Sequence, residues 1–326
     1  MSSDVEISVI IPVYGCADCL EELCERLLQT LAELPGKHEI LLVDDASPDQ
    51  SWTHIVQLAA RHPEIYGLRL SRNHGQHYAI TAGLDNSRGN WVVVMDCDLQ
   101  DQPEEIIKLY QKAQEGYDQV VAVRENRQDS FFIKLTSRLF YVLFNYLSEQ
   151  NLDNRVANFG IYSRKVVRAI LQHRERDRSF GLLAAIVGFR RTLLPVAHAS
   201  RPRGTSTYNF RKRLNLALDH ILSHSTKPLM LAVKMGFVVS FLSSAFALWL
   251  ILRFLFFSKA PEGWTSVMVS MFFISGMLMS VVGMVGIYIG KVYGEVKSRP
   301  LYIVDKITPG LQKSSEPQLQ RPPCRQ

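Results

Sequence analysis

Two aspartates separated by one residue follow a short apolar segment of the chain. The segment is Trp91-Val-Val-Val-Met95, and Asp96, Asp98 and then Gln100 come after it. An uninterrupted apolar run predicts a strand buried on both faces, and ligands of open parallel sheets bind beyond the carboxyl ends of such strands. Two neighbouring carboxylates are costly unless a cation joins them, and oxygen ligands suit Mg²⁺ or Mn²⁺. Such an ion can hold a pyrophosphate and stabilise it as it leaves. In the alternative interpretation, the two aspartates only cap the turn before the next helix.

Strand-like and helix-like segments alternate through the first 124 residues. This alternation predicts an α/β fold with a parallel sheet and right-handed crossovers. The expected strands are residues 7–12, 39–43, 67–71, 91–95 and 119–124, and the main expected helices are residues 20–31, 74–86 and 103–115. Each strand end carries a polar residue, which predicts a site along this edge: Tyr14, Asp45, Arg72, Asp96 and Arg124.

Two uncharged segments, residues 235–252 and 263–290, follow the α/β region. Each is long enough to span a bilayer of about 30 Å. Basic residues lie on the outer side of both segments, so the positive-inside rule places both ends in the cytoplasm. Residues 211–225 form an expected amphipathic helix, which we place at the bilayer surface; an ordinary bundle helix is the alternative.

The net charge of +6 and the five cysteines limit other functions. The positive charge gathers next to the membrane segments rather than on a separate face, which argues against a nucleic-acid binder. An odd number of cysteines and no expected signal sequence predict reduced thiols in the cytosol. Cys16-x-x-Cys19 also fits a redox or zinc motif, although no second pair completes a ligand set.

Six motifs together resemble family 2 glycosyltransferases with a GT-A domain, in the polyisoprenyl-phosphate branch. That branch includes dolichol-phosphate mannose synthase and the bacterial undecaprenyl-phosphate glucosyl and 4-deoxy-4-formamido-arabinose (aminoarabinose) transferases. The resemblance covers roughly residues 7–304, and Gly75-Gln76-His77 is most similar to the aminoarabinose transferases. The motifs occupy residues 9–14, 43–47, 71–75, 96–104, 201–206 and 293–300.

The resemblance implies a role for each candidate residue. Asp96 and Asp98 would be the catalytic carboxylates and, with Gln100, would hold Mg²⁺ or Mn²⁺ against the donor diphosphate. The nucleotide sugar would also contact four further residues: Pro12, Tyr14, Asp45 and Arg72. The acceptor phosphate or the diphosphate would meet Arg124, Arg201 and Ser206, because the guanidinium fork matches phosphate oxygens. For each of these two arginines, a solvated surface charge is the alternative.

The reaction implied by the resemblance is an inverting transfer from a nucleotide sugar to a polyprenyl phosphate. UDP is the preferred nucleotide and GDP the second, undecaprenyl phosphate is the expected acceptor, and the product would be a lipid-linked monosaccharide for the cell envelope. Two alternatives are a catalytically silent membrane scaffold with a decayed pocket and a processive polysaccharide synthase. The chain lacks the Gln-x-x-Arg-Trp motif of such synthases.

Three positions depart from the family pattern. Gly15-Cys16 stands where relatives have Asn-Glu, Thr207 replaces a lysine, and Asn158 replaces a carboxylate proposed as a base. Asparagine cannot take a proton. A phosphate monoester has a second pKa of about 6, so the acceptor is largely ionised at neutral pH and can attack without a base.

These expectations give a domain plan and a location. Residues 1–210 form a cytoplasmic GT-A catalytic domain with a Rossmann-like, mostly parallel sheet, and residues 211–229 form the juxtamembrane amphipathic helix. Residues 230–290 hold two transmembrane helices, and residues 291–326 form a cytoplasmic C-terminal segment with a disordered tail. The expected location is the bacterial inner membrane, with the catalytic domain facing the cytoplasm. Relatives suggest a tetramer, and Gly286-x-x-x-Gly290 is a weak pointer to close helix packing.

Overall fold

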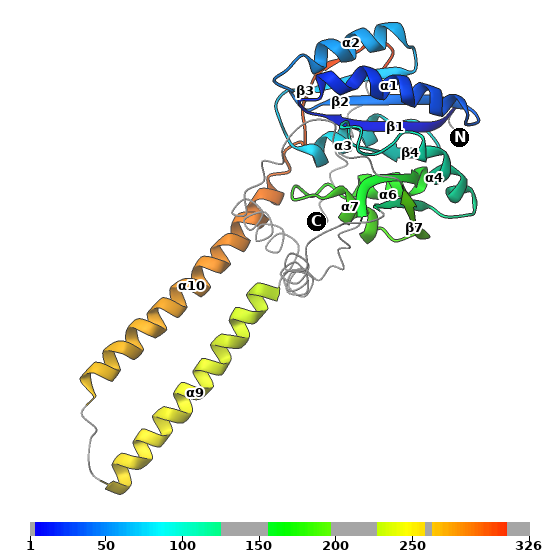
Figure 1. Ribbon diagram of the computed structural model, residues 1–326. Helices are drawn as coiled ribbons and strands as arrows, with labels where there is room; N and C mark the ends of the chain where they lie inside the picture. Colours follow the sequence, from blue (N-terminus) through cyan, green and yellow to red (C-terminus); the bar gives the residue numbers. More distant parts are fainter. Residues whose placement is uncertain (1–3, 125–155, 197–226, 258–262, 312–326) are drawn as a thin grey trace, which may run out of the picture. The chain divides into compact units, whose positions relative to one another are not determined.

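The computed structural model describes residues 4–124, 156–196, 227–257 and 263–311. The chain divides into two compact units. The first contains the sheet and its helices, and it takes in residues from Pro300 onward as well as the N-terminal part of the chain. The second contains two long helices (Figure 1).

The sheet has eight strands within the described residues, in the order β7-β5-β6-β4-β1-β2-β3-β8. Strands β4, β1, β2 and β3 are parallel neighbours, whereas β6 is antiparallel to β4 and β5, and β8 is antiparallel to β3. The predicted α/β sheet is therefore confirmed, as a mixed sheet with a parallel centre. The strands are β1 Val5–Val13, β2 Lys37–Asp44, β3 Ile65–Leu70, β4 Trp91–Val94, β5 Gln119–Arg124, β6 Val156–Ser163, β7 Arg191–Val196 and β8 Val304–Ile307.

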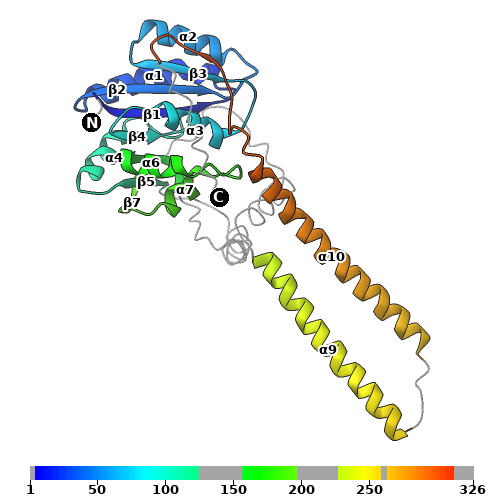
Figure 2. The same cartoon turned by 180° about the vertical axis from the view of Figure 1, so that it is seen from behind.

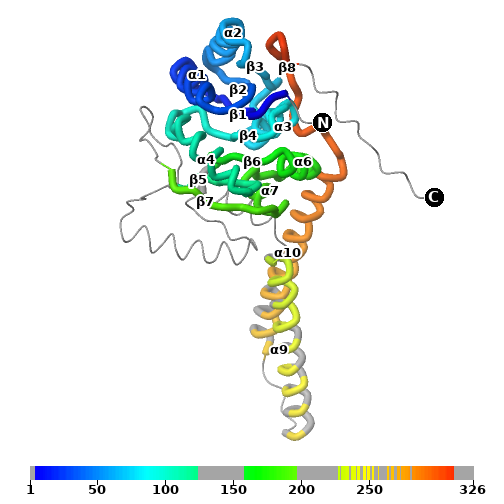
Figure 3. Tube along the Cα trace, turned by 90° about the vertical axis from the view of Figure 1, so that its right-hand side faces the viewer, coloured from blue at the N-terminus to red at the C-terminus, as the bar shows by residue number. Residues whose placement is uncertain are grey.

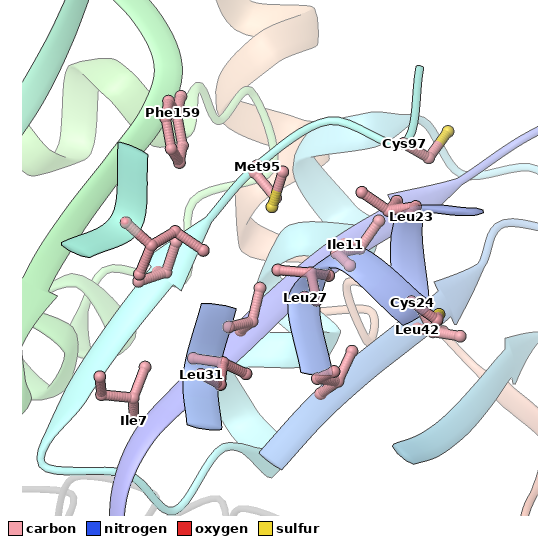
Figure 4. Close-up of a cluster of buried hydrophobic side chains, with 14 of the residues drawn as sticks. Ile7, Ile11, Leu23, Cys24, Leu27, Leu31, Leu42, Met95, Cys97 and Phe159 are labelled. Atoms are coloured by element: carbon pink, nitrogen blue, oxygen red, sulfur yellow. The ribbon is translucent and has the colours of Figure 1, made fainter. Parts of the chain in front are cut away.

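Helices cover both faces of this sheet. Successive strand residues point to opposite faces, and apolar residues on both faces pack against helices. In β1, Ile7, Val9 and Ile11 belong to one apolar cluster, and Ile10 belongs to the other. Figure 4 shows the first cluster, in which leucines of α1 pack against β1. Helices α1 Ala17–Ala32, α2 Ser51–Arg61 and α4 Glu105–Gln114 cover that face, and α3 Gln76–Asn86, α6 Arg164–Gln172 and α7 Phe180–Ile186 cover the other (Figure 3).

The second unit contains helices α9, Lys227–Phe257, and α10, Trp264–Val296 (Figure 2). Among the described residues, one helical segment, Phe273–Val296, is long and apolar enough to cross a membrane; a shorter apolar stretch, Leu229–Val239, lies in α9. The sequence predicted two membrane spans, and both stay predictions, because length and composition identify this segment only as a candidate. The amphipathic helix expected at residues 211–225 lies outside the described residues.

The chain returns to the sheet after α10. Strand β8 pairs with β3, and the Gly67 N–H donates a 2.8 Å hydrogen bond to Thr308 Oγ1. The Tyr302 hydroxyl donates to Asp85 at the end of α3, and Leu311 is buried in the core. Residues 291–326 were predicted to form one C-terminal segment; in the structure, β8 within it is an edge strand of the sheet.

Candidate active site

A pocket of about 320 Å³ lies at the carboxyl ends of β1, β2 and β4. Ligands of open α/β sheets bind at this edge. Five residues predicted from the sequence line the pocket: Pro12, Tyr14, Asp45, Asp96 and Asp98. The structure adds six further lining residues to them: Val13, Cys16, Asn73, Gly75, Gln76 and Cys97.

Asp45, at the end of β2, holds the loop that precedes α3. Its two carboxylate oxygens accept the backbone N–H groups of His74 and Gly75, each at 2.7 Å. Gly75 has φ of +101°, a conformation that favours glycine and allows both N–H groups to face the carboxylate. Burial raises the pKa of Asp45 despite these two hydrogen bonds. Asp45 therefore shapes the pocket by fixing this loop, in addition to lining it.

Gln76 connects that loop to the predicted metal-binding motif. It is the first residue of α3, and its Nε2 donates a 2.5 Å hydrogen bond to Asp96 Oδ1. The loop thus joins the ends of β2 and β4, which flank β1 in the sheet. No role was predicted for Gln76 or Asn73 from the sequence. The only signal for Gln76 was its place in the Gly75-Gln76-His77 string.

The backbone after Asp98 turns sharply. Leu99 has φ of +58°, and the Gln100 N–H donates to Asp98 Oδ1 at 3.2 Å. Asp96 and Asp98 line the pocket, whereas Gln100 is not among its lining residues. The structure therefore brings together two of the three predicted metal ligands.

The two carboxylates fit the predicted ion by their chemistry. In the part of the chain that the structure describes, no group of three or more His, Cys, Asp and Glu side chains is placed to hold a metal. Mg²⁺ is commonly bound by one or two carboxylates together with substrate phosphates, so a complete protein cage is not required. Asp96 and Asp98 are hard oxygen donors that suit this mode of binding.

One prediction about the cysteines is wrong. The sequence predicted reduced thiols, but the structure joins Cys16 and Cys97 by a disulfide, with their Cα atoms 6.4 Å apart. Cys19 keeps its thiol, so the Cys16-x-x-Cys19 motif is not the bonded pair. Sequence spacing did not show this partner, because the two residues are 81 positions apart and meet only when β1 and β4 become neighbours.

The remaining predicted residues either do not line the pocket or lie outside the described residues. Arg72 is exposed and is not among the lining residues. Arg124 ends β5, and its side chain lies outside the described residues, as do Arg201 and Ser206. Asn158 lies half-buried on β6. The acceptor-binding roles of Arg124, Arg201 and Ser206 therefore stay predictions.

Comparisons with known proteins agree with the motifs. Residues 8–171 match the family described as glycosyl transferase family 2. An undecaprenyl-phosphate 4-deoxy-4-formamido-L-arabinose transferase of Klebsiella pneumoniae (strain 342) is 37% identical over 309 residues, 93% of this chain and 93% of that protein. An uncharacterized glycosyltransferase of Synechocystis is 38% identical over 304 residues, 93% of this chain and 96% of that protein.

A solved structure is also similar in part. The mannosyltransferase of Pyrobaculum calidifontis, in complex with GDP-Man and Mn²⁺, has a TM-score of 0.49 and 19% identity, over 67% of this chain and 63% of that chain. The two curated relatives align along 93% of this chain, and the family model covers the strands and loops that build the pocket. The chain therefore belongs to glycosyl transferase family 2 and is a glycosyltransferase.

Proposed function

We propose that this glycosyltransferase moves a sugar from a nucleotide sugar to undecaprenyl phosphate, with inversion at the anomeric carbon. The observation that carries the proposal is the convergence of Asp96 and Asp98 on a pocket that Tyr14 and Asp45 also line. The Klebsiella relative, an undecaprenyl-phosphate transferase by name, supports the acceptor. UDP is the preferred nucleotide, and GDP is the second choice.

Different pocket residues would contact different parts of the nucleotide-sugar donor. Tyr14 is 53% exposed at the pocket, where its ring offers a face on which a nucleotide base can stack. Asp45 keeps the loop before α3 in place, and Gln76 orients Asp96. Asp96 and Asp98 would hold Mg²⁺ or Mn²⁺, which neutralises the charge of the departing nucleoside diphosphate when it is bound. Arg72 lies outside the pocket wall, so its contact with the donor stays a prediction.

The acceptor supplies its own nucleophile. Its phosphate monoester is largely ionised at neutral pH, because the second pKa is about 6. Asn158 cannot remove a proton, and an anionic phosphate oxygen does not need one removed. The protein then has to align this oxygen behind the anomeric carbon, opposite the leaving diphosphate, and in-line attack inverts that carbon. We assign the acceptor phosphate to Arg124, Arg201 and Ser206.

The sheet topology limits how the chain can cross a membrane between β7 and β8. Strands β1 to β7 precede α9 in the chain and β8 follows α10, yet all belong to one sheet. A sheet lies in a single compartment, so an even number of membrane crossings must separate β7 from β8. Two spans satisfy this requirement, and we place the sheet at the cytoplasmic face of the bacterial inner membrane, where the positive-inside rule puts it.

The test is a donor screen on the full-length protein in detergent. Undecaprenyl phosphate, Mn²⁺ and a panel of UDP- and GDP-sugars are supplied, and lipid products are read by mass spectrometry. A single lipid-linked monosaccharide establishes the reaction and the sugar. A polymeric product contradicts the proposal in favour of a processive synthase. A folded protein that binds no nucleotide and forms no product supports the silent scaffold instead.

A further inference from the structure

The disulfide joins two neighbouring loops that both contribute to the pocket wall. Cys16 follows β1, and Cys97 lies between Asp96 and Asp98 after β4. Strands β1 and β4 are parallel neighbours with Ile10 opposite Val94, so the loops leave the sheet side by side. Both cysteines line the pocket. A bond between them therefore crosslinks the metal-binding motif to the loop that follows Tyr14.

The two sulfur atoms differ in accessibility. Cys97 is 7% exposed and packs in the apolar core, as Figure 4 shows. Cys16 is half-buried and caps the N-terminus of α1, a position that favours a thiolate. Cys16 is therefore the sulfur through which a reductant or oxidant enters. In contrast, burial raises the pKa of the Cys24 thiol to about 12, which makes that cysteine unreactive.

The bonded pocket is narrow for the proposed donor. Its volume of about 320 Å³ lies at the lower limit of the roughly 300–1,000 Å³ typical of sites for drug-sized ligands. Both carboxylates already accept hydrogen bonds from the protein, Asp96 from Gln76 and Asp98 from the Gln100 backbone. A bond between the two loops limits how far this part of the wall can open to admit a nucleotide diphosphate, its metal ion and its sugar.

We propose that Cys16 and Cys97 form a reversible thiol–disulfide lock on the nucleotide pocket. The disulfide holds the loops after β1 and β4 together and weakens binding of the nucleotide diphosphate. The dithiol form lets these loops part and is the form that binds the donor. The Cα separation of 6.4 Å permits the bond to form without rebuilding either strand. This inference rests on the proposed function for the identity of the ligand.

The chemistry requires a low-molecular-weight disulfide such as glutathione disulfide as the oxidant. The Cys16 thiolate attacks it, forms a mixed disulfide and releases one glutathione thiolate. The Cys97 thiolate then attacks the Cys16 sulfur and releases the second. The protein dithiol loses two electrons and two protons, and glutathione disulfide becomes two thiols. Two equivalents of thiol reverse the reaction.

The experiment compares nucleotide binding in the two redox forms of the full-length protein. Detergent-purified protein is reduced or treated with glutathione disulfide, the linkage is mapped by alkylation and mass spectrometry, and UDP is titrated calorimetrically with Mn²⁺. We expect the oxidised protein to bind UDP about tenfold more weakly, a typical coupling between linked sites. By reciprocity, UDP with Mn²⁺ stabilises the dithiol and raises the midpoint potential of the pair by about 30 mV for that tenfold change.

Single variants identify the pair. Cys16→Ser binds UDP with the same affinity before and after the oxidant, and Cys97→Ser provides a second test on the other loop. Cys19→Ser is the matched control, because Cys19 lies one helical turn from Cys16 and keeps its thiol; it retains the wild-type response. The inference is overturned if Cys97 stays open to alkylation after oxidation, or if the mapped disulfide forms without a change in UDP affinity.

Sugar transfer is measured on the same samples to separate this inference from the proposed function. If the reduced protein transfers no sugar but its UDP affinity still depends on the disulfide, the lock stands and the proposed function fails. If both redox forms transfer sugar equally well at donor concentrations below the KM, the proposed function stands and the lock fails.

Discussion

The two ends of the central strands carry polar clusters of opposite character. At the amino ends, one carboxylate is surrounded by donors. Glu39 accepts hydrogen bonds from Ser8 Oγ at 2.6 Å, from the Arg88 N–H at 2.6 Å and from Arg88 Nε at 2.8 Å. Ser8 Oγ in turn accepts the Gly89 N–H, and Arg164 donates from Nε to the Gly89 carbonyl. Glu39 is buried in this amino-end cluster and is paired with Arg88, which is typical of a structural network.

At the carboxyl ends, three carboxylates face a pocket. Asp45, Asp96 and Asp98 line it, and among its described lining residues none is lysine or arginine. Their hydrogen bonds fix loops and leave the pocket lined with negative charge. Equally polar groups on the same strands thus serve two purposes. Donors that saturate a carboxylate stabilise the fold, and carboxylates gathered at a pocket make a site for a cation and its ligand.

Asp98→Asn should abolish metal binding at the pocket while leaving the fold intact. Asparagine keeps the oxygen that accepts the Gln100 N–H but removes the charge needed for the ion. We expect sugar transfer to fall by about a hundredfold or more, because metal stabilisation of the leaving group is worth several kcal/mol. Transfer is measured by lipid product formation, and thermal unfolding should match the wild type. A variant with wild-type transfer would remove Asp98 from the site.

Glu39→Gln should have the reverse effect, lowering the stability of the fold without changing sugar transfer. The substitution places an amide NH₂ group where the Glu39 carboxylate oxygen accepts hydrogen bonds from the Arg88 guanidinium, so these bonds are lost. Hydrogen bonds to charged groups contribute roughly 1.5–3 kcal/mol to stability. We expect the free energy of unfolding to fall by about 2 kcal/mol. Thermal or denaturant unfolding measures this loss. Transfer per folded molecule should be unchanged. A specific loss of transfer without loss of stability would show that the two ends are not distinct in role.

Gln76→Ala tests whether the loop before α3 orients the metal-binding motif. The Nε2 contact to Asp96 Oδ1 is lost, while α3 itself is retained. We expect about a tenfold weaker apparent Mn²⁺ affinity, the usual effect of removing a partner behind a metal ligand. The readout is the Mn²⁺ concentration for half-maximal transfer, with the maximal rate less affected.

Asn86→Ala is the matched control, because the Asn86 side chain donates its hydrogen bond to the backbone carbonyl of Ala82 in the same helix. Equal Mn²⁺ dependence in both variants would contradict a positioning role.

His77 gives the smallest predicted effect, a pH dependence of stability. Its Nδ1 accepts the Phe180 N–H at 3.3 Å, and burial, followed by the charge of Arg178, lowers its pKa from 6.5. Protonation therefore favours the unfolded state. The stability contributed by neutral His77 is complete above the unfolded pKa and is lost as pH falls through the folded pKa.

We expect the unfolding temperature to fall between about pH 7.5 and about pH 5.5, and to fall less in His77→Asn. Asn86→Ala serves again as the control on the same helix, with the wild-type pH profile. Burial also lowers the pKa of His74, so some dependence should remain in the variant. An identical pH profile in His77→Asn would exclude His77 as its source.

The sequence predicted local features better than long-range ones. Apolar runs located the parallel strands, and the polar residues after them marked the pocket edge, because both follow from local patterns. Strands β6 and β8 reverse direction in the sheet, and no local signal determines pairing partners across the chain. For the same reason the Cys16–Cys97 bond and the Gln76–Asp96 contact were missed: each joins residues that meet only after the strands pair. Acceptor residues near positions 201–206 still depend on motif resemblance alone.

A UDP titration of the reduced full-length protein, with and without Mn²⁺, is the most direct test of the metal-dependent donor site. We predict saturable binding that requires Mn²⁺ and is lost in Asp98→Asn, while Glu39→Gln, measured below its unfolding temperature, binds as the wild type does. UDP binding that is equal without Mn²⁺, or that survives in Asp98→Asn, would contradict the assignment of the carboxyl-end aspartates to the donor diphosphate.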